Sequence, residues 1–314
     1  MQQDNLALKN ILDSKTCFKL VCGAGNENLE EIEKLVYVYS KAGCNIFDIS
    51  ANLDALKAAK RGLNRAGIKD NRFICISVGI KGDPHTNKAF INKEICKSCF
   101  KCEKICPQNA ISNFLVDKTK CIGCSKCLSA CNFYAIEMKS LPTDLNKVLP
   151  DLITEGFDCL EFHAISDKEQ EVFDIWNTLN KLFNGFLSIC IDRALLSNKT
   201  LCSRLKKMLS IRKDFTTIIQ ADGSPMSGGN DDYKTTLQSV ATAELIQKEN
   251  FPAYIILSGG TNSKTKELSK LCNVQINGIA IGSFARKIVK NYLHGNMNEE
   301  EAVKIAKNLV ESTY

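Results

Sequence analysis

Half of the cysteines in this chain lie in one short segment. Of the 16 cysteines, eight fall between residues 96 and 131, in two runs that each read Cys-x2-Cys-x2-Cys-x3-Cys. The second run repeats the first at an offset of 25 residues, and the pair Ala110-Ile111 recurs as Ala135-Ile136. Three thiolates within seven residues can bind three corners of a cubane, so the segment predicts a metal-binding fold of its own.

The spacing is that of the two-cluster bacterial ferredoxins, in which the fourth cysteine of each run binds the cluster of the other run. We therefore expect two [4Fe-4S] clusters. The first is predicted to be bound by Cys96, Cys99, Cys102 and Cys131. The second is predicted to be bound by Cys121, Cys124, Cys127 and Cys106. Structural zinc and disulfides are the alternatives, although zinc sites generally use separated Cys-x2-Cys pairs. Asn132 follows Cys131 where a ferredoxin usually has proline.

The rest of the composition excludes several classes of protein. The 314 residues carry a net charge of +6 without a run of five like charges, so no nucleic-acid partner is indicated. No apolar stretch approaches the roughly 18 residues of a membrane span, and the first residues do not resemble a signal peptide. We expect a cytoplasmic protein. The other eight cysteines mostly lie in apolar runs and are predicted to be small buried side chains.

Short apolar runs recur along the remaining chain. They predict buried parallel strands at 18–24, 44–50, 72–79, 157–164, 186–192, 216–222, 253–259 and 277–283. Helical patterns lie between them, so we predict an α/β fold, a (β/α)8 TIM-like barrel. Its parts are predicted at 1–91 and 140–314, with the ferredoxin-like domain at 92–139 inserted after the third strand. The 266 residues outside the insert are near the roughly 250 typical of this barrel. An open doubly wound sheet is the alternative.

Charged side chains at the predicted strand ends are candidates for chemistry, because barrel active sites lie at that face. They are Asp48, Glu161, His163, Asp192, Arg193 and Asp222. We take His163, Asp192 and Asp222 as candidates for binding a ligand at the barrel mouth. The alternative is a rim of salt-bridged residues, and because no nucleophile–base pair can be placed, we assign no catalytic residue.

Glycine motifs end the last two predicted strands. Gly259, Gly260 and Thr261 follow the seventh strand, and Gly282 and Ser283 end the eighth. Glycines here would let backbone N–H groups approach a phosphate, such as that of FMN or a sugar. Tight turns are the alternative. A further polar loop, 222–229, follows the sixth strand and is either a lid or a connection.

Several longer segments carry a resemblance to a known family. FKLVCGA (18–24), GDPH (82–85), the cysteine octet, EFHA (161–164), QADGSPMSG (220–228), SGGTNSKT (258–265) and AIGSFARK (280–287) resemble the light-dependent period protein A family of cyanobacteria. At 229–231 the chain has Gly-Asn-Asp where that family usually has Asp-Ile-Gly. The resemblance implies an iron–sulfur protein of the circadian clock input that senses redox state. It also implies association with a clock-input kinase and Kai proteins.

Two main functions remain open. In one, the clusters sense redox state and a partner binds differently to the two states. In the other, an iron–sulfur oxidoreductase passes electrons between its clusters and a flavin or phosphorylated ligand at the barrel mouth. Electron carriers or quinones would then be its partners. We favour the non-catalytic sensor, since the residues supply no clear catalytic set; an adaptor with purely structural clusters is a third interpretation.

Overall fold

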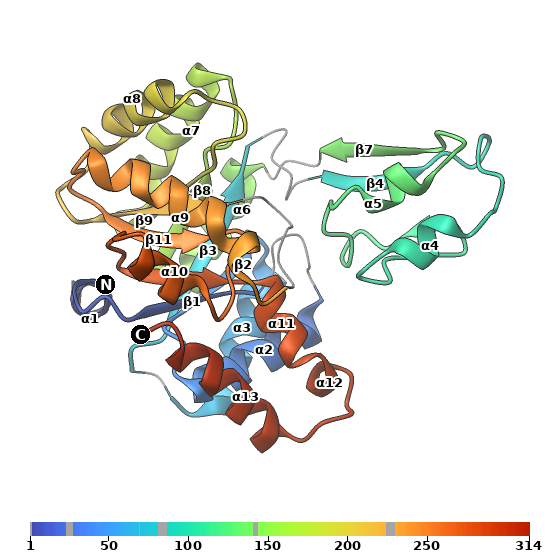
Figure 1. The fold of residues 1–314 in the computed structure, drawn as a ribbon, viewed down its shortest axis with the longest axis horizontal. Coiled ribbons are helices and arrows are strands. Elements are labelled where there is room, and N and C mark those ends of the chain that lie inside the picture. The colour runs from blue at the N-terminus through green and yellow to red at the C-terminus, as the bar shows by residue number, and fades with distance from the viewer. Residues whose placement is uncertain (1, 23–27, 69, 81–86, 141–143, 224–229) are drawn as a thin grey trace.

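The computed structural model closes eight parallel strands into one barrel (Figure 1). The strands are β1 (Cys17–Val21), β2 (Ile46–Ser50), β3 (Phe73–Gly79), β8 (Cys159–His163), β9 (Phe186–Ile191), β10 (Thr217–Asp222), β11 (Tyr254–Ser258) and β12 (Gly278–Ile281). They are ordered as in the chain, and β12 pairs with β1, so this sheet has no edge. The eight predicted strands and the barrel are confirmed, and the open sheet is wrong. The structure describes residues 2–22, 28–68, 70–80, 87–140, 144–223 and 230–314.

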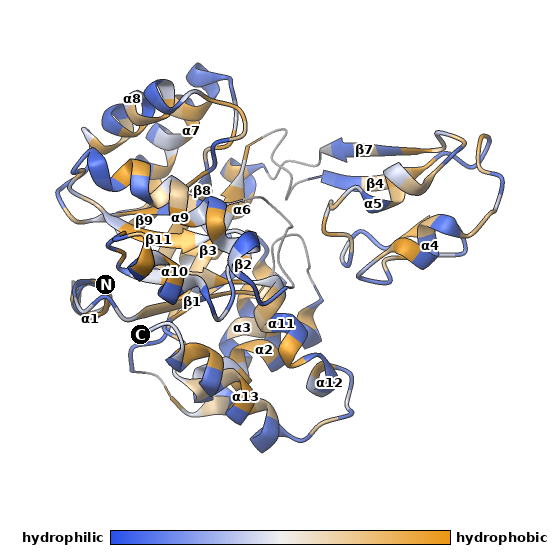
Figure 2. Ribbon diagram, in the orientation of Figure 1, coloured by the Kyte–Doolittle hydropathy of each residue, from blue (hydrophilic) through white to orange (hydrophobic). Residues whose placement is uncertain are grey.

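Helices surround the barrel. They are α1 (Gln2–Asp13), α2 (Leu29–Ala42), α3 (Leu53–Ala66), α6 (Leu145–Glu155), α7 (Glu169–Leu182), α8 (Asn198–Leu209), α9 (Tyr233–Lys248), α10 (Thr265–Leu271), α11 (Ser283–Ile288), α12 (Lys290–Leu293) and α13 (Glu299–Glu311). The start of α2 is fixed by Asn28, whose side chain accepts from Glu31 N, and its end by Gly43 at φ 103°. Figure 2 shows α13 with hydrophobic and hydrophilic residues in alternation, as expected of a helix with one buried face.

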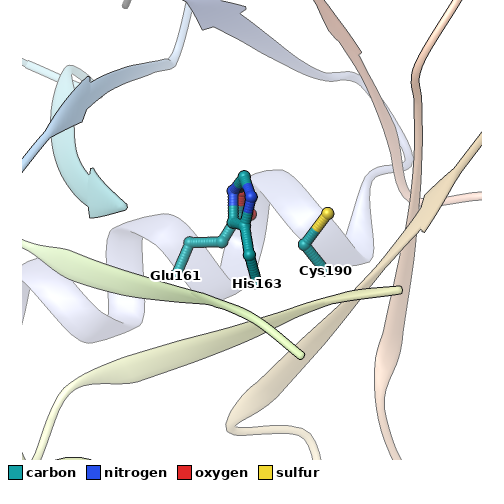
Figure 3. A group of neighbouring side chains, drawn as sticks. All are labelled: Glu161, His163 and Cys190. Atoms are coloured by element: carbon teal, nitrogen blue, oxygen red, sulfur yellow. Dashed lines mark hydrogen bonds and ion pairs between the residues drawn. The ribbon is translucent and has the colours of Figure 1, made fainter. Parts of the chain in front are cut away.

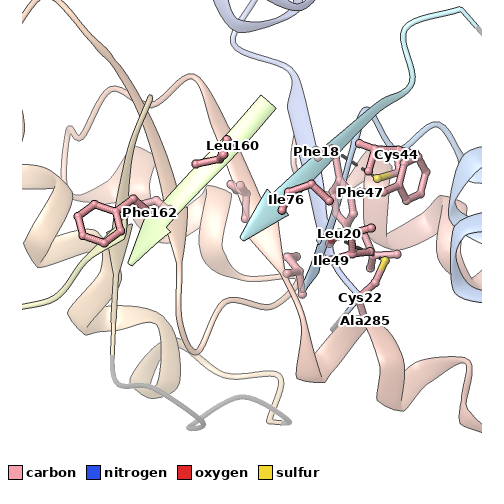
Figure 4. Packing of buried hydrophobic residues seen from close by; sticks show 14 of the residues in the cluster. Phe18, Leu20, Cys22, Cys44, Phe47, Ile49, Ile76, Leu160, Phe162 and Ala285 are labelled. Carbon is pink, nitrogen blue, oxygen red and sulfur yellow. Dashed lines mark hydrogen bonds between the residues drawn. The ribbon is translucent and has the colours of Figure 1, made fainter. Parts of the chain in front are cut away.

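Successive side chains of each barrel strand point alternately into the barrel and outward toward the helices. Glu161, His163 and Cys190 lie inside the barrel and close together (Figure 3). Leu160 and Phe162, the alternate residues of β8, belong instead to the apolar layer between the strands and the helices (Figure 4). This period of two places polar side chains inside the barrel without interrupting the apolar layer around it.

The interior of the barrel is apolar at its N-terminal end. Cys75, Cys159 and Phe186 are buried there, and they pack in one cluster with Leu8 and Leu12 of α1. Because α1 belongs to the cluster that fills this end, polar chemistry is confined to the opposite end, where the strands finish.

The cysteine segment forms a small lobe beside the barrel (Figure 1). Its elements are β4 (Asn87–Ile91), α4 (Lys101–Ile105), β5 (Ile111–Ser112), β6 (Leu115–Val116), α5 (Lys126–Ala130) and β7 (Ile136–Ser140). β4 and β7 form an antiparallel pair outside the barrel sheet. The chain leaves the barrel after β3 and returns to it at β8, so the lobe is inserted after the third barrel strand, as predicted.

Candidate functional site

The lobe gathers its cysteines into two quartets, each around a small cavity. The first cavity is lined by Cys96, Cys99, Cys102 and Cys131. The second is lined by Cys106, Cys121, Cys124 and Cys127. Each quartet takes three cysteines from one run and the fourth from the other, which is how two-cluster ferredoxins distribute their ligands.

An approximate twofold symmetry relates the two runs. Asn92 N donates to Ala135 O and Asp117 N donates to Ala110 O, both at 2.8 Å. Asn92 and Asp117 are equivalent positions 25 residues apart, and so are Ala110 and Ala135. The residues that precede α4 and α5 also share one left-handed backbone conformation. Each run therefore contributes its fourth cysteine to the other quartet through an equivalent turn.

The surroundings of the sulfurs fit a cluster bound by four thiolates. Three backbone amides donate to sulfur: Ala110 N to Cys106 Sγ at 3.3 Å, Ala135 N to Cys131 Sγ at 3.4 Å and Ala89 N to Cys121 Sγ at 3.4 Å. Such N–H groups stabilise negative charge on cluster sulfurs. Burial, and then the neighbouring thiols, raise the pKa of Cys127 to about 11. Bound iron would supply the positive charge that a group of thiolates requires.

A buried lysine organises the middle of the barrel interior. Lys19 Nζ lies 2.6 Å from Glu161 Oε2 and 2.9 Å from Asp48 Oδ2, and donates to Gln220 Oε1 at 2.8 Å. The side chains of Lys19, Asp48 and Glu161 are all at most 5% exposed. Three charges are thus held away from water and compensate one another.

The pKa shifts show which carboxylate pairs most strongly with this lysine. Burial acts to raise the pKa of Glu161, but Lys19 and His163 outweigh it and lower that pKa below its ordinary value. For Asp48 the balance is reversed, because burial raises its pKa and Lys19 opposes this only in part. Lys19 and Glu161 therefore form the principal ion pair, in agreement with their shorter distance.

A second polar layer lies above the lysine, at the ends of the strands. The ligand atoms of Glu161, His163 and Cys190 lie within 4.8 Å of one another (Figure 3). His163 Nε2 is 3.2 Å from Glu161 Oε1, which also accepts from Gln220 Nε2 at 3.0 Å. These residue types can bind zinc, but the contacts of Glu161 satisfy its carboxylate without an ion. Cys190 Sγ donates to Asp222 Oδ2 at 3.7 Å.

The structure brings together only some of the strand-end residues. Asp48, Glu161, His163 and Asp222 all line one cavity. Asp192 is buried and its Oδ1 accepts from Ala194 N at 3.0 Å, as part of a turn.

Arg193, by contrast, is exposed and donates to Asn198 Oδ1. Sequence reasoning missed Lys19, Gln220 and Cys190. A lysine within FKLV and a glutamine within TIIQAD were the available signals, since a polar side chain in a buried strand needs a polar partner.

Backbone conformation and close packing explain why glycines follow β11. Gly259 and Gly260 have φ of 69° and 77°, in the region that favours glycine. A Cβ on Gly259 would lie 2.1 Å from Asp222 Oδ1, so this glycine makes room for a buried carboxylate. Thr261 Oγ1 donates to Ala280 O at 2.5 Å and holds the turn against β12.

Gly282 is also explained by packing. A Cβ there would lie 3.2 Å from Val21 Cβ, and Ser283 begins the short helix α11. Phosphate binding by these glycines stays a prediction. The loop residues 224–229 and the segment 82–85 lie outside the described residues.

A cavity of about 460 Å³ connects the barrel mouth with the lobe. Its floor contains Glu161, His163 and Asp222 of the barrel interior. Cys124 of the second quartet lies in its wall. The cavity has a size typical of small-molecule sites and places a cysteine of the lobe beside the polar layer of the barrel.

Fold and cysteine quartets define the class: a TIM-like barrel protein with an inserted iron–sulfur-binding lobe. Residues 152–312 match the family model described as Light dependent period A C-terminal domain, and residues 95–141 match LdpA Fe-S cluster-binding domain. The chain belongs to the light-dependent period A family. Light dependent period A of Synechococcus elongatus (strain ATCC 33912 / PCC 7942 / FACHB-805) is 28% identical over 291 residues, which cover 86% of this chain and 80% of that protein.

Solved structures share the fold. The tryptophan synthase subunit alpha from Legionella pneumophila has a TM-score of 0.51 at 8% identity, covering 98% of each chain. Tryptophan synthase of Mycobacterium tuberculosis has a TM-score of 0.50 at 8% identity, covering 98% of this chain and 97% of that one. At such identity the likeness concerns the barrel alone. Among the described residues, none of the helices combines the length and apolar character needed to cross a bilayer.

Asp222 should make the stability of the barrel pH-dependent. Burial, followed by the charges of Glu161 and Asp192, raises the pKa of Asp222 from 3.8 to about 7, against the opposing effects of His163 and Ser258. Its proton therefore stabilises the folded state fully below about pH 4. We expect this contribution to the free energy of unfolding, about 4 kcal/mol, to be lost as the pH rises from 4 through 7.

Urea unfolding at pH 5 and pH 8 checks this expectation. The single tryptophan, Trp176, is buried against the barrel, so its fluorescence follows the barrel and not the lobe. Asp222→Asn should remove most of the loss at pH 8, whereas exposed Asp214→Asn should leave it unchanged. If the free energy of unfolding fell equally from pH 5 to pH 8 in wild type and in Asp222→Asn, the assignment would be contradicted.

Proposed function

We propose that this chain is a cytoplasmic iron–sulfur protein that reports redox state to the machinery setting a light-dependent period. Two [4Fe-4S] clusters, bound by the two cysteine quartets, would supply reversible one-electron chemistry. The observation that carries the proposal is the pairing of each cysteine triplet with the fourth cysteine of the other run. The link to period control rests on the family and on the name of the Synechococcus relative.

The effect of one electron on this chain would be considerable. Each oxidised cluster with four thiolates carries a charge of about −2, so two clusters bring the formal +6 down to roughly +2. Reduction adds one further negative charge to a small lobe. Lysines surround the quartets in sequence: Lys93, Lys97, Lys101, Lys104, Lys118, Lys120 and Lys126. A partner that contacts them would experience a changed field, at most a kcal/mol-scale effect for exposed charges.

The lobe also exposes apolar surface for such a partner. Seven large hydrophobic side chains of the lobe are between 41% and 90% exposed: Ile95, Phe100, Ile105, Leu115, Leu128, Phe133 and Tyr134. Exposed apolar side chains gathered on a small unit are characteristic of protein-binding surfaces. We propose the clock-input kinase and Kai proteins, implied by the family resemblance, as the partners that bind here.

Binding of these partners to oxidised and dithionite-reduced protein, both kept anaerobic, tests the proposal. We expect affinities that differ several-fold between the two states. Leu115→Ser, in β6 and outside both quartet cavities, should weaken binding in both states. Leu271→Ser, which changes another exposed residue, on α10, should not. Equal affinity in the two states would refute redox reporting through these partners.

A second function is favoured by one observation. Because Cys124 lies in the wall of the cavity at the barrel mouth, a cluster on that quartet would adjoin any ligand bound there. An oxidoreductase could pass electrons between such a cluster and FMN, another phosphorylated ligand, or a quinone. Acid release of a fluorescent flavin, or steady turnover of a nicotinamide or quinone by purified protein, would favour this function over the sensor.

A further inference from the structure

The two cysteine quartets have different surroundings, although they are built from a repeat. Pro107, Gln108 and Cys124 line both the cavity of the second quartet and the cavity at the barrel mouth. None of the described residues that line the first cavity lines the one at the barrel mouth. Cys99 is exposed, whereas Cys124, its equivalent in the repeat, is half-buried. The second quartet therefore faces the barrel, and the first quartet has a cysteine that a partner in solution can approach.

Three phenylalanines surround the first quartet: Phe100, Phe114 and Phe133 all line its cavity. The residues at the equivalent positions of the repeat are all polar: Ser125, Lys139 and Gln108. The rings of Phe100 and Phe114 pack together, with their centroids 4.7 Å apart. Phe100 and Phe133 nevertheless remain 45% and 42% exposed. Apolar side chains left at the surface around one quartet, and absent from the equivalent positions at the other, indicate a contact surface at the first.

The same surface carries positive charge. Lys97 and Lys101 line the first cavity and are exposed, and within the described chain neither lies within ion-pair distance of a carboxylate. Glu103 of α4 is partly engaged, since its Oε1 accepts from Phe114 N at 3.2 Å. A cluster would add about −2, but three of its four cysteines are buried or half-buried, so the exposed lysines meet a partner first. Charge complementarity favours an acidic partner.

We propose that the first quartet is the electron entry site of this protein, where a small acidic one-electron carrier protein docks on Phe100, Lys97 and Lys101. The proposal rests on the clusters of the proposed function and adds the class of protein that reduces them. One electron passes from the reduced carrier, which is oxidised, to the first cluster, which is reduced, and no bond forms or breaks. Weak redox encounters bury the smallest protein interfaces, so a patch around one exposed cysteine suffices. Leu115, which lines neither quartet cavity, remains available to the partners that respond to redox state.

Carbodiimide cross-linking maps the docking surface without relying on electron transfer, because it joins a lysine to a carboxylate in direct contact. The probe is a plant-type [2Fe-2S] ferredoxin, an acidic carrier, mixed with the oxidised full-length protein. We expect cross-links at Lys97 and Lys101 that are lost at about 0.5 M salt. Lys126, the equivalent of Lys101 in the repeat, provides the matched control and should give none. Cross-links at Lys126 as frequent as those at Lys101 would overturn the proposal.

Stopped-flow spectroscopy measures electron transfer through this surface. Transfer is followed in the direction that the potentials favour, either from reduced ferredoxin to the protein or from dithionite-reduced protein to ferredoxin. The second-order rate constant should fall about 10-fold or more between low salt and about 0.5 M salt. At low salt the double variant Lys97→Glu/Lys101→Glu should lower it about 10-fold, whereas Lys126→Glu should leave it within about twofold.

Two further measurements on each variant separate the docking surface from the clusters themselves. Iron content shows whether a variant still binds both clusters, and reduction by dithionite, which needs no docking surface, shows whether those clusters accept electrons. A rate constant that neither salt nor the double variant changes, in protein with full iron content, would overturn the proposal. Wild-type protein that dithionite cannot reduce would instead refute the proposed redox function, and the entry site with it.

Discussion

Replacing Cys102 by serine should remove one cluster and weaken the second. Cys102 is buried in the first quartet, on α4, and Cys106 of the second quartet directly follows that helix. Loss of the first cluster frees α4 and with it a ligand of the other cluster. We expect iron and acid-labile sulfide to fall from about eight of each per chain, the content of two cubanes, to below about four.

Chemical analysis of anaerobically purified protein measures this effect. Cys272→Ser changes an exposed cysteine outside the lobe and should leave both contents unchanged. A variant that keeps four iron and four sulfide atoms in an undisturbed second cluster would show that the quartets are independent. Stoichiometric zinc without sulfide in the wild type would overturn the cluster assignment itself.

Lys19→Met should destabilise the barrel by about 3–5 kcal/mol, the usual cost of leaving one partner of a buried ion pair uncompensated. The lysine lies between Asp48 and Glu161, and each of their side chains is at most 5% exposed. For a domain of this size the corresponding fall in melting temperature is on the order of 10 °C. Thermal unfolding followed by Trp176 fluorescence measures it.

A surface pair provides the matched control. Lys248→Met removes a lysine that pairs with Glu244 at 2.6 Å while both side chains are about half exposed or more, and should change stability by less than about 0.5 kcal/mol. Adding Glu161→Gln to Lys19→Met should restore part of the loss, because it removes one of the two uncompensated charges. A loss below about 1 kcal/mol in Lys19→Met would show that the buried network is not held together by this lysine.

The barrel could be predicted because its strands are nearly continuous apolar runs with buried residues on both faces. The strand TTIIQAD, for example, was expected at 216–222 and is observed as Thr217–Asp222. Strands β4 and β7 were not predicted. Their sequences, NKAFI and IEMKS, mix polar and apolar residues instead of forming a continuous apolar run, and the lobe is too small to bury one whole face of the pair. Their pairing depends on the two ends of the lobe being brought together.

The polar interior was only partly predictable. Strand-end position identified Asp48, Glu161, His163 and Asp222, because a barrel brings the ends of its parallel strands to one face. The central role of Lys19 depends on cross-barrel distances that no local pattern contains. The cavity beside Cys124 likewise depends on where the lobe lies against the barrel mouth.

The position of the lobe in the chain also sets an order for maturation during synthesis. β3 pairs with β8, which follows the whole lobe in the chain, and β1 pairs with β12, which ends at residue 281. The ribosome therefore completes both cysteine runs well before the strand that closes the barrel exists. At about 5–20 residues per second, roughly 10–30 s separate the two events. Within that interval both quartets are complete in the chain, so iron and sulfide can be delivered to the lobe before the barrel closes.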